Sequence, residues 1–189
     1  RQHGCDRITL RRYKRVKPLR EYDEHRSRRI YAQIRFRKPD RAVGTAEQHY
    51  DLPHGAPHGA PPEDARLIAE ARRAAETAHA PFSGYRVGAA ARLESGKIIT
   101  ASNQESEAFP AGLCAERVLL FGHMASSPQD KITALAIASH PDDAECYPCG
   151  GCRQVMLDAM RRQGAPFRIL MSSGRSATVV DDPTCLMPF

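Results

Sequence analysis

The stretch Pro148-Cys149-Gly150-Gly151-Cys152-Arg153 places two thiols three residues apart, at the start of a segment whose apolar spacing predicts a helix to Arg162. A second stretch, Cys114-Ala115-Glu116, lies near the start of another predicted helix, over residues 112–125. The positive end of a helix favours the thiolate form of cysteine, which is the form that binds metal. Three thiolates fill three of the four positions of tetrahedral zinc and leave the fourth to water, as in catalytic sites.

Glu116 follows the first of these cysteines by two residues. A carboxylate at that place can take a proton from a metal-activated water and return it to a leaving group. The alternative is a closed structural zinc site with Cys146 as fourth ligand. The spacing Cys146-x-x-Cys149-x-x-Cys152 is awkward for such a site and gives Glu116 no role. We therefore predict a catalytic centre.

The segments around these motifs alternate between helical and strand-like patterns. Helices are predicted over residues 63–78, 112–125 and 149–162, and strands over 85–93, 97–101, 132–139, 167–172 and 177–180. The order is helix, strand, strand, helix, strand, helix, strand, strand. This order favours one sheet with helices on both faces.

Three parts are expected along the chain. Residues 1–27 are Arg-rich without periodicity and are interpreted as a flexible basic leader. Residues 28–61 hold a period-two pattern over 29–37, which predicts an edge strand, and then a linker that repeats Pro-His-Gly-Ala. Residues 62–189 form the expected catalytic domain.

Composition excludes several classes of protein. The chain has 189 residues, 41% hydrophobic and 26% charged, which suits a single globular domain with appendages. No apolar run is long enough to span a membrane, and no secretory signal is seen, so we expect a cytoplasmic protein without membrane association.

The net charge of +6 comes from residues 1–41, which hold 15 Lys and Arg against 5 Asp and Glu. Charge therefore gives little support for nucleic acid as a partner.

With these motifs in place, the sequence resembles the cytidine deaminases of the small, all-cysteine type. That family pairs Cys-Ala-Glu on one helix with Pro-Cys-x-x-Cys on the next. Residues 81–90, Pro-Phe-Ser-Gly-Tyr-Arg-Val-Gly-Ala-Ala, resemble the family's Pro-Tyr-Ser-x-Phe-x-Val-Gly-Ala-Ala, and Asn103-Gln104-Glu105 resembles its ribose-binding Asn-x-Glu. The resemblance implies a three-layer α/β/α sandwich with a mixed five-stranded sheet.

The resemblance also implies a set of site residues. One Zn²⁺ per chain would be held by Cys114, Cys149 and Cys152, with Glu116 as the proton shuttle. The expected substrate contacts are hydrogen bonds from Asn103 and Glu105 to the ribose, packing of Tyr85 on the pyrimidine in place of a Phe, and a bond from the Ala115 backbone N–H to the base carbonyl. Arg117 and Arg153 match arginines that donate toward the thiolates, which offsets a site charge of about −1.

The implied activity is hydrolytic deamination of cytidine and deoxycytidine to uridine and deoxyuridine with release of ammonia, a step of pyrimidine salvage, in a homotetramer. The sequence departs from the family at Ser106, Glu107 and Phe109, close to the expected nucleoside pocket.

Three alternatives stay open. One is a deaminase of another aminopyrimidine nucleoside, such as a blasticidin-like antibiotic, against which Asn103-x-Glu105 argues because it suits a ribose. Another is a deaminase of deoxycytidylate or of a base within nucleic acid, against which Cys114 argues because those enzymes usually have His there. The last is a non-enzymatic zinc-dependent RNA-binding protein, which only the basic leader supports.

Overall fold

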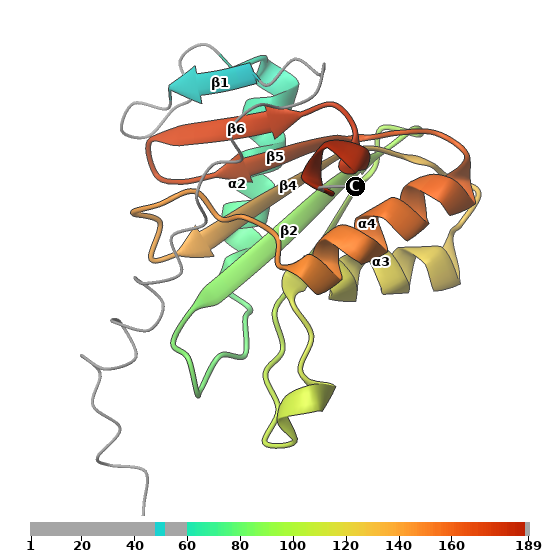
Figure 1. Cartoon of the computed structure of the whole chain (residues 1–189). Helices are drawn as coiled ribbons and strands as arrows, with labels where there is room; N and C mark the ends of the chain where they lie inside the picture. The colour runs from blue at the N-terminus through green and yellow to red at the C-terminus, as the bar shows by residue number, and fades with distance from the viewer. Residues whose placement is uncertain (1–47, 52–59, 188–189) are drawn as a thin grey trace, which may run out of the picture. The chain divides into compact units, whose positions relative to one another are not determined.

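The computed structural model describes residues 48–51 and 60–187, which include one mixed β-sheet (Figure 1). Its strand order is β1-β6-β5-β4-β2-β3. The strands are β1 (Gln48–Asp51), β2 (Arg86–Leu93), β3 (Ile98–Ser102), β4 (Ile132–His140), β5 (Arg168–Ser172) and β6 (Ser176–Val180). Strands β4 and β5 are parallel, and the other neighbours are antiparallel.

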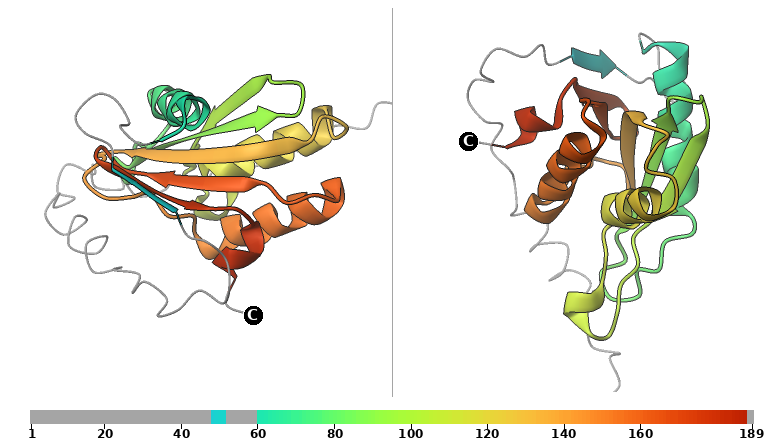
Figure 2. Two further views of the ribbon diagram at one scale, coloured as in Figure 1. Left: turned by 90° about the horizontal axis from the view of Figure 1, so that it is seen from above. Right: turned by 90° about the vertical axis from the view of Figure 1, so that its right-hand side faces the viewer.

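Helices cover both faces of this sheet (Figure 2). Helix α2 (Pro62–Ala75) packs on one face, and α3 (Ala115–Ser126) and α4 (Gly150–Gln163) lie on the other. Two 3₁₀ turns, η1 (Phe109–Ala111) and η2 (Pro183–Leu186), complete the described elements. The predicted three-layer sandwich is confirmed, and β2 to β6 form its mixed five-stranded sheet.

Strand β1 adds a sixth strand, which the sequence did not predict, next to β6 at the edge of the sheet. The edge strand predicted over residues 29–37, the basic leader and nearly all of the predicted linker lie outside the described residues. In the part of the chain that is described, no helix is long and apolar enough to cross a membrane.

The two faces of the sheet bury different side chains. Toward α2 the strands present small residues, and Leu67 and Ile68 of the helix fill the space above them. The face toward α3 and α4 carries the larger cluster, which includes Leu120, Met156 and Phe167. Strand β4 is buried along nearly its whole length, as its continuous apolar run predicted.

The chain path brings the first turns of α3 and α4 together. Helix α4 is the crossover between the parallel strands β4 and β5, so it begins beyond the carboxyl end of β4. Helix α3 follows β3 after a long loop and contacts α4 (Figure 1). Residues from two distant stretches of sequence therefore meet at one end of the two helices.

Candidate active site

Three cysteines meet where α3 and α4 begin. Cys114 and Cys149 are the residues that directly precede the two helices, and Cys152 lies in the first turn of α4, fully buried. Their Sγ atoms all lie within 4.8 Å of one another. The Sγ of Cys149 is 3.9 Å from that of Cys114 and 3.4 Å from that of Cys152. The structure thus brings together the three ligands that the sequence predicted.

This donor set fits a zinc ion. Tetrahedral Zn²⁺ with Zn–S bonds of about 2.3 Å requires sulfur atoms about 3.8 Å apart, close to the separations found here. The backbone N–H of Cys152 donates to the Sγ of Cys149 at 3.4 Å. The thiols of Cys114 and Cys152 also contact this sulfur, and these contacts together with the N–H lower the pKa of Cys149. Three thiolates of this kind leave one coordination position for a fourth ligand.

Glu116 lies in the first turn of α3 with only 3% of its surface exposed. Burial raises the pKa of its carboxyl group to about 7, and the negative charge of Cys149 contributes to the rise. A carboxyl group with a pKa near neutrality can both accept and give up a proton under physiological conditions. Glu116 therefore has the burial and the acidity of a proton-transfer group.

Two arginines flank the cysteines. The Nη2 of Arg117 donates to the Sγ of Cys114 at 3.7 Å, and this contact raises the pKa of the guanidinium. Arg153 donates from Nε to the carbonyl of Pro148 at 3.0 Å and from Nη1 to the carbonyl of Leu186 at 3.3 Å. Its role at the thiolates stays a prediction, and these contacts tie the segment before Cys149 to the C-terminal turn.

Asn103 and Glu105, the residues predicted to bind the ribose, form hydrogen bonds with the backbone of the loop before β2 and of its first residues. The Oε2 of Glu105 accepts hydrogen bonds from the backbone N–H groups of Phe82 at 2.8 Å and Ser83 at 3.2 Å. The amide of Asn103 accepts from the N–H of Val87 at 2.8 Å and donates to the carbonyl of Tyr85 at 3.0 Å. Tyr85, Asn103 and Glu105 thus form one connected network.

Ala115 is fully buried at the first position of α3. A helix leaves its first backbone N–H groups without partners inside the helix. The N–H of Ala115, beside the cysteines, is therefore suited to bind an acceptor on a ligand.

Comparison with known proteins agrees with this geometry. Residues 61–163 match the model of the cytidine and deoxycytidylate deaminase zinc-binding region. A cytidine deaminase of Halalkalibacterium halodurans is 36% identical over 92 residues, which are 49% of this chain and 68% of the relative. The chain belongs to the cytidine and deoxycytidylate deaminase family. Members of this family are zinc-dependent hydrolytic enzymes, and the cysteine cluster is the part of this chain that could hold the metal.

Solved structures of the deaminase family share the fold. A cytidine deaminase from Burkholderia pseudomallei has a TM-score of 0.57 and 30% identity, and the match covers 65% of this chain and 94% of that protein. A cytidine deaminase from Mycobacterium leprae has a TM-score of 0.54 and 26% identity, with 69% and 100% covered.

Cys146 and Ser139 were assigned no role from the sequence. Cys146 does not belong to the cysteine cluster of this deaminase, so the closed four-cysteine site is not formed. Burial raises the pKa of its thiol to about 12, and the thiol contacts Ser139 and the hydroxyl of Tyr85. The only sequence signal for this contact is Tyr85 itself, which stands where the family has a Phe. A tyrosine hydroxyl that is buried needs a hydrogen-bonding partner.

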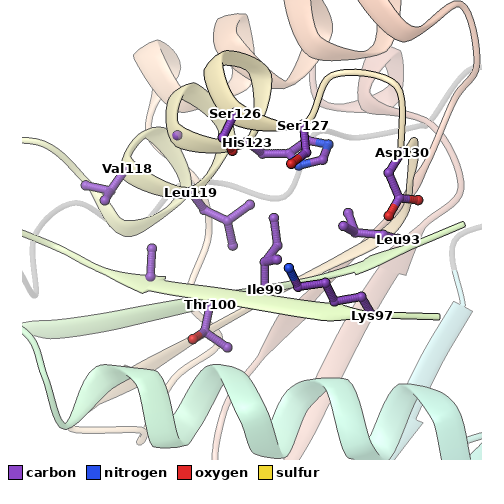
Figure 3. A pocket seen from close by; sticks show the side chains of 12 residues that line it. Leu93, Lys97, Ile99, Thr100, Val118, Leu119, His123, Ser126, Ser127 and Asp130 are labelled. Atoms are coloured by element: carbon purple, nitrogen blue, oxygen red, sulfur yellow. The ribbon is translucent and has the colours of Figure 1, made fainter. Parts of the chain in front are cut away.

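A cavity of about 340 Å³ lies elsewhere, between β3 and α3 (Figure 3). It is lined by apolar side chains such as Ile99 and Leu119 and by polar ones such as Lys97, His123 and Asp130. The three cysteines and Glu116 do not line it. Deaminase chemistry needs the cysteine cluster, so we assign the active site there and not to this cavity.

Proposed function

We propose that this protein deaminates cytidine and deoxycytidine by hydrolysis, giving uridine and deoxyuridine with release of ammonia, in pyrimidine salvage. The observation that carries the proposal is the buried carboxyl group of Glu116 two residues from Cys114 in a cluster of three thiols. The relatives and structures that the chain matches are named cytidine deaminases, which supports cytidine as the substrate class.

Proton transfer is the task of Glu116. When bound by Cys114, Cys149 and Cys152, Zn²⁺ would lower the pKa of a water and so make a nucleophile available for C4 of the base. Glu116 takes the proton that this water loses and delivers it to N3 of the pyrimidine. It then takes a second proton, from the hydroxyl group now bonded to C4, and gives it to the amino group, so that the C4–N bond breaks, ammonia leaves and the C4 carbonyl of uridine forms. The pKa of about 7 suits both directions of transfer.

The neighbouring residues bind and orient the nucleoside. The N–H of Ala115 donates to the base carbonyl, and the ring of Tyr85 packs on the pyrimidine. Glu105 still has its Oε1 free of any hydrogen bond among the described residues, and the amide of Asn103 retains one N–H. These atoms are available for the ribose hydroxyls. Arg117 offsets the negative charge of the thiolates.

We also propose a homotetramer in the cytoplasm, with residues 62–189 as its catalytic domain. The exposed aromatic residues support association, because Phe109 is 89% exposed and Phe121 is 45% exposed. Large apolar side chains at the surface often mark contacts with another protein chain.

An absorbance assay of the purified, zinc-loaded chain tests the activity. Cytidine and deoxycytidine should both be converted, and deoxycytidine 5′-phosphate should be converted poorly. Glu116→Gln should lower kcat by about 10²–10⁴-fold, the range for general acid–base groups, with zinc content unchanged. Glu94→Gln is the matched control, because Glu94 is exposed in the turn between β2 and β3. A folded chain with one zinc ion that converts neither nucleoside would refute the proposal.

A further inference from the structure

Tyr85 is fixed through its backbone just before β2. Its N–H donates to the Oγ of Ser83 at 3.0 Å, and its carbonyl accepts from the Nδ2 of Asn103 at 3.0 Å. The next residue begins the strand. These bonds fix the position of the main chain and leave the direction of the side chain to be set by other contacts.

The side chain of Tyr85 ends in the interior. Its hydroxyl is in hydrogen-bonding contact with Ser139 and with the thiol of Cys146, and burial raises its pKa above the ordinary value. Ser139 is 4% exposed and Cys146 is 5% exposed. Since both partners are buried, the hydroxyl points into the protein. The ring packs against the larger core cluster and stays partly exposed, so only its exposed part is available to a bound molecule.

Both partners are themselves held in place. Ser139 lies on β4, opposite Val87 of β2, and its Oγ donates to the carbonyl of Pro141 at 3.0 Å. The N–H of Cys146 donates to the carbonyl of Ser172 at 3.1 Å. Cys146 also precedes Cys149 by three residues, so the same short segment carries a contact of Tyr85 and a ligand of the metal site.

We propose that Ser139 and Cys146 are positioning residues that hold the ring of Tyr85 against the pyrimidine, an inference that rests on the proposed function. The hydroxyl of Tyr85 serves as an inward anchor and makes no bond to the substrate. Tyr85 therefore acts on the nucleoside through its ring alone. The anchor restricts rotation of the ring, and a ring that is fixed before binding loses less conformational entropy when the nucleoside arrives.

Steady-state kinetics on the zinc-loaded full chain test this proposal. Tyr85→Phe and Cys146→Ala should each raise the KM for cytidine about 2–10-fold, the effect of one lost hydrogen bond. For both variants kcat should stay within about twofold of the original chain, because neither the hydroxyl of Tyr85 nor the thiol of Cys146 touches the reacting atoms. The ratio of kcat/KM for cytidine to that for deoxycytidine should not change, because the hydroxyl does not contact the substrate.

A double-mutant cycle separates this role from a general loss of stability. Tyr85→Phe combined with Cys146→Ala should raise KM no more than Tyr85→Phe alone, because both changes remove the same contact. Cys146→Ser, which keeps a hydrogen-bonding group, should restore KM to within about twofold of the original. Ser139→Ala should raise KM. Its control, Ser172→Ala, removes a buried bond to the carbonyl of Ile137 and should lower stability without changing KM.

The outcomes distinguish this inference from the proposed function. An original chain that does not convert cytidine refutes the function, and the inference falls with it, before any variant is made. An active chain whose KM is unchanged by Tyr85→Phe and Cys146→Ala overturns the inference alone. So do effects on KM that multiply in the double variant, because independent effects would mean that the two side chains do not share one contact.

Discussion

The Nη2 of Arg117 lies 3.7 Å from the Sγ of Cys114 and 3.4 Å from the carbonyl oxygen of Gly112. One guanidinium therefore joins a metal ligand to the loop that leads into α3. Its positive charge lies beside the cysteine cluster. Three thiolates bound to Zn²⁺ would give this cluster a net charge of about −1. A donor of this kind both orients the ligand and lowers the net negative charge at the metal.

Arg117→Gln should weaken zinc binding about 10–100-fold, the usual effect of removing a partner of a metal ligand. Competition with a chromogenic chelator measures the dissociation constant directly. Arg161→Gln, in the last turn of α4 and exposed, is the matched control and should bind zinc as the original chain does. If Arg117→Gln binds zinc as tightly as Arg161→Gln does, the contact between Arg117 and Cys114 does not stabilise the metal site.

Glu116 makes stability depend on pH in the metal-free chain. Its pKa is about 7 in the folded protein and near the ordinary value of 4.5 when unfolded, so the folded state binds the proton more tightly. Stability is therefore fully present below about pH 4.5 and is lost as pH rises through about 7. The total loss from this group is about 3 kcal/mol.

Urea unfolding of the metal-free, reduced chain and of Glu116→Gln between pH 4.5 and 8 measures this effect. Glutamine stays uncharged, so the free energy of unfolding of the variant should exceed that of the original chain by an amount that grows with pH. The difference should level off above about pH 8. A difference that does not vary with pH would contradict the raised pKa.

The helices and central strands could be predicted because their signals are local. The helix predicted over residues 149–162 is found over Gly150–Gln163, and the strand over 132–139 is found over Ile132–His140. The spacing of apolar residues locates such segments in the sequence. The helix starts located in this way place Cys114 and Cys149 at the beginnings of two helices. The sequence could therefore predict that Cys114, Cys149 and Cys152 act together, but it could not predict the distances between their Sγ atoms.

Other features depend on contacts that the sequence does not display. Strand β1 has four residues and no apolar alternation, and only pairing with β6 defines it. The contact of Tyr85 with Ser139 and Cys146 joins the residue before β2 to the end of β4 and the loop that follows it, which lie far from Tyr85 in the sequence. The resemblance assigns Asn103 to ribose, whereas its bonds to the backbone of Val87 and Tyr85 emerge only in the folded chain.

Those bonds predict that Asn103 matters for stability as well as for binding. Asn103→Ala leaves the buried N–H of Val87 without its partner, which should lower the free energy of unfolding by about 1–3 kcal/mol. Because the carbonyl of Tyr85 is released too, the KM for cytidine should rise. Gln104→Ala, an exposed neighbour, is the control for both measurements. Unchanged urea unfolding in Asn103→Ala would show that the loop does not depend on this amide.

Gly88 marks the closest approach of α2 to the sheet. A Cβ atom added there would overlap the backbone oxygen of Ala71 and the backbone nitrogen of Ala75, and would lie 3.0 Å from the carbonyl carbon of Ala74. Backbone atoms inside a helix cannot move aside as the end of a side chain can, so Gly88→Ala should lower the free energy of unfolding by about 3 kcal/mol or more. Gly122→Ala is the matched control, because a Cβ atom on Gly122 in α3 meets nothing within 4 Å and alanine favours a helix by about 1 kcal/mol. Thermal and urea unfolding should therefore shift in opposite directions for the two variants, and equal shifts would contradict the close packing of α2 on β2.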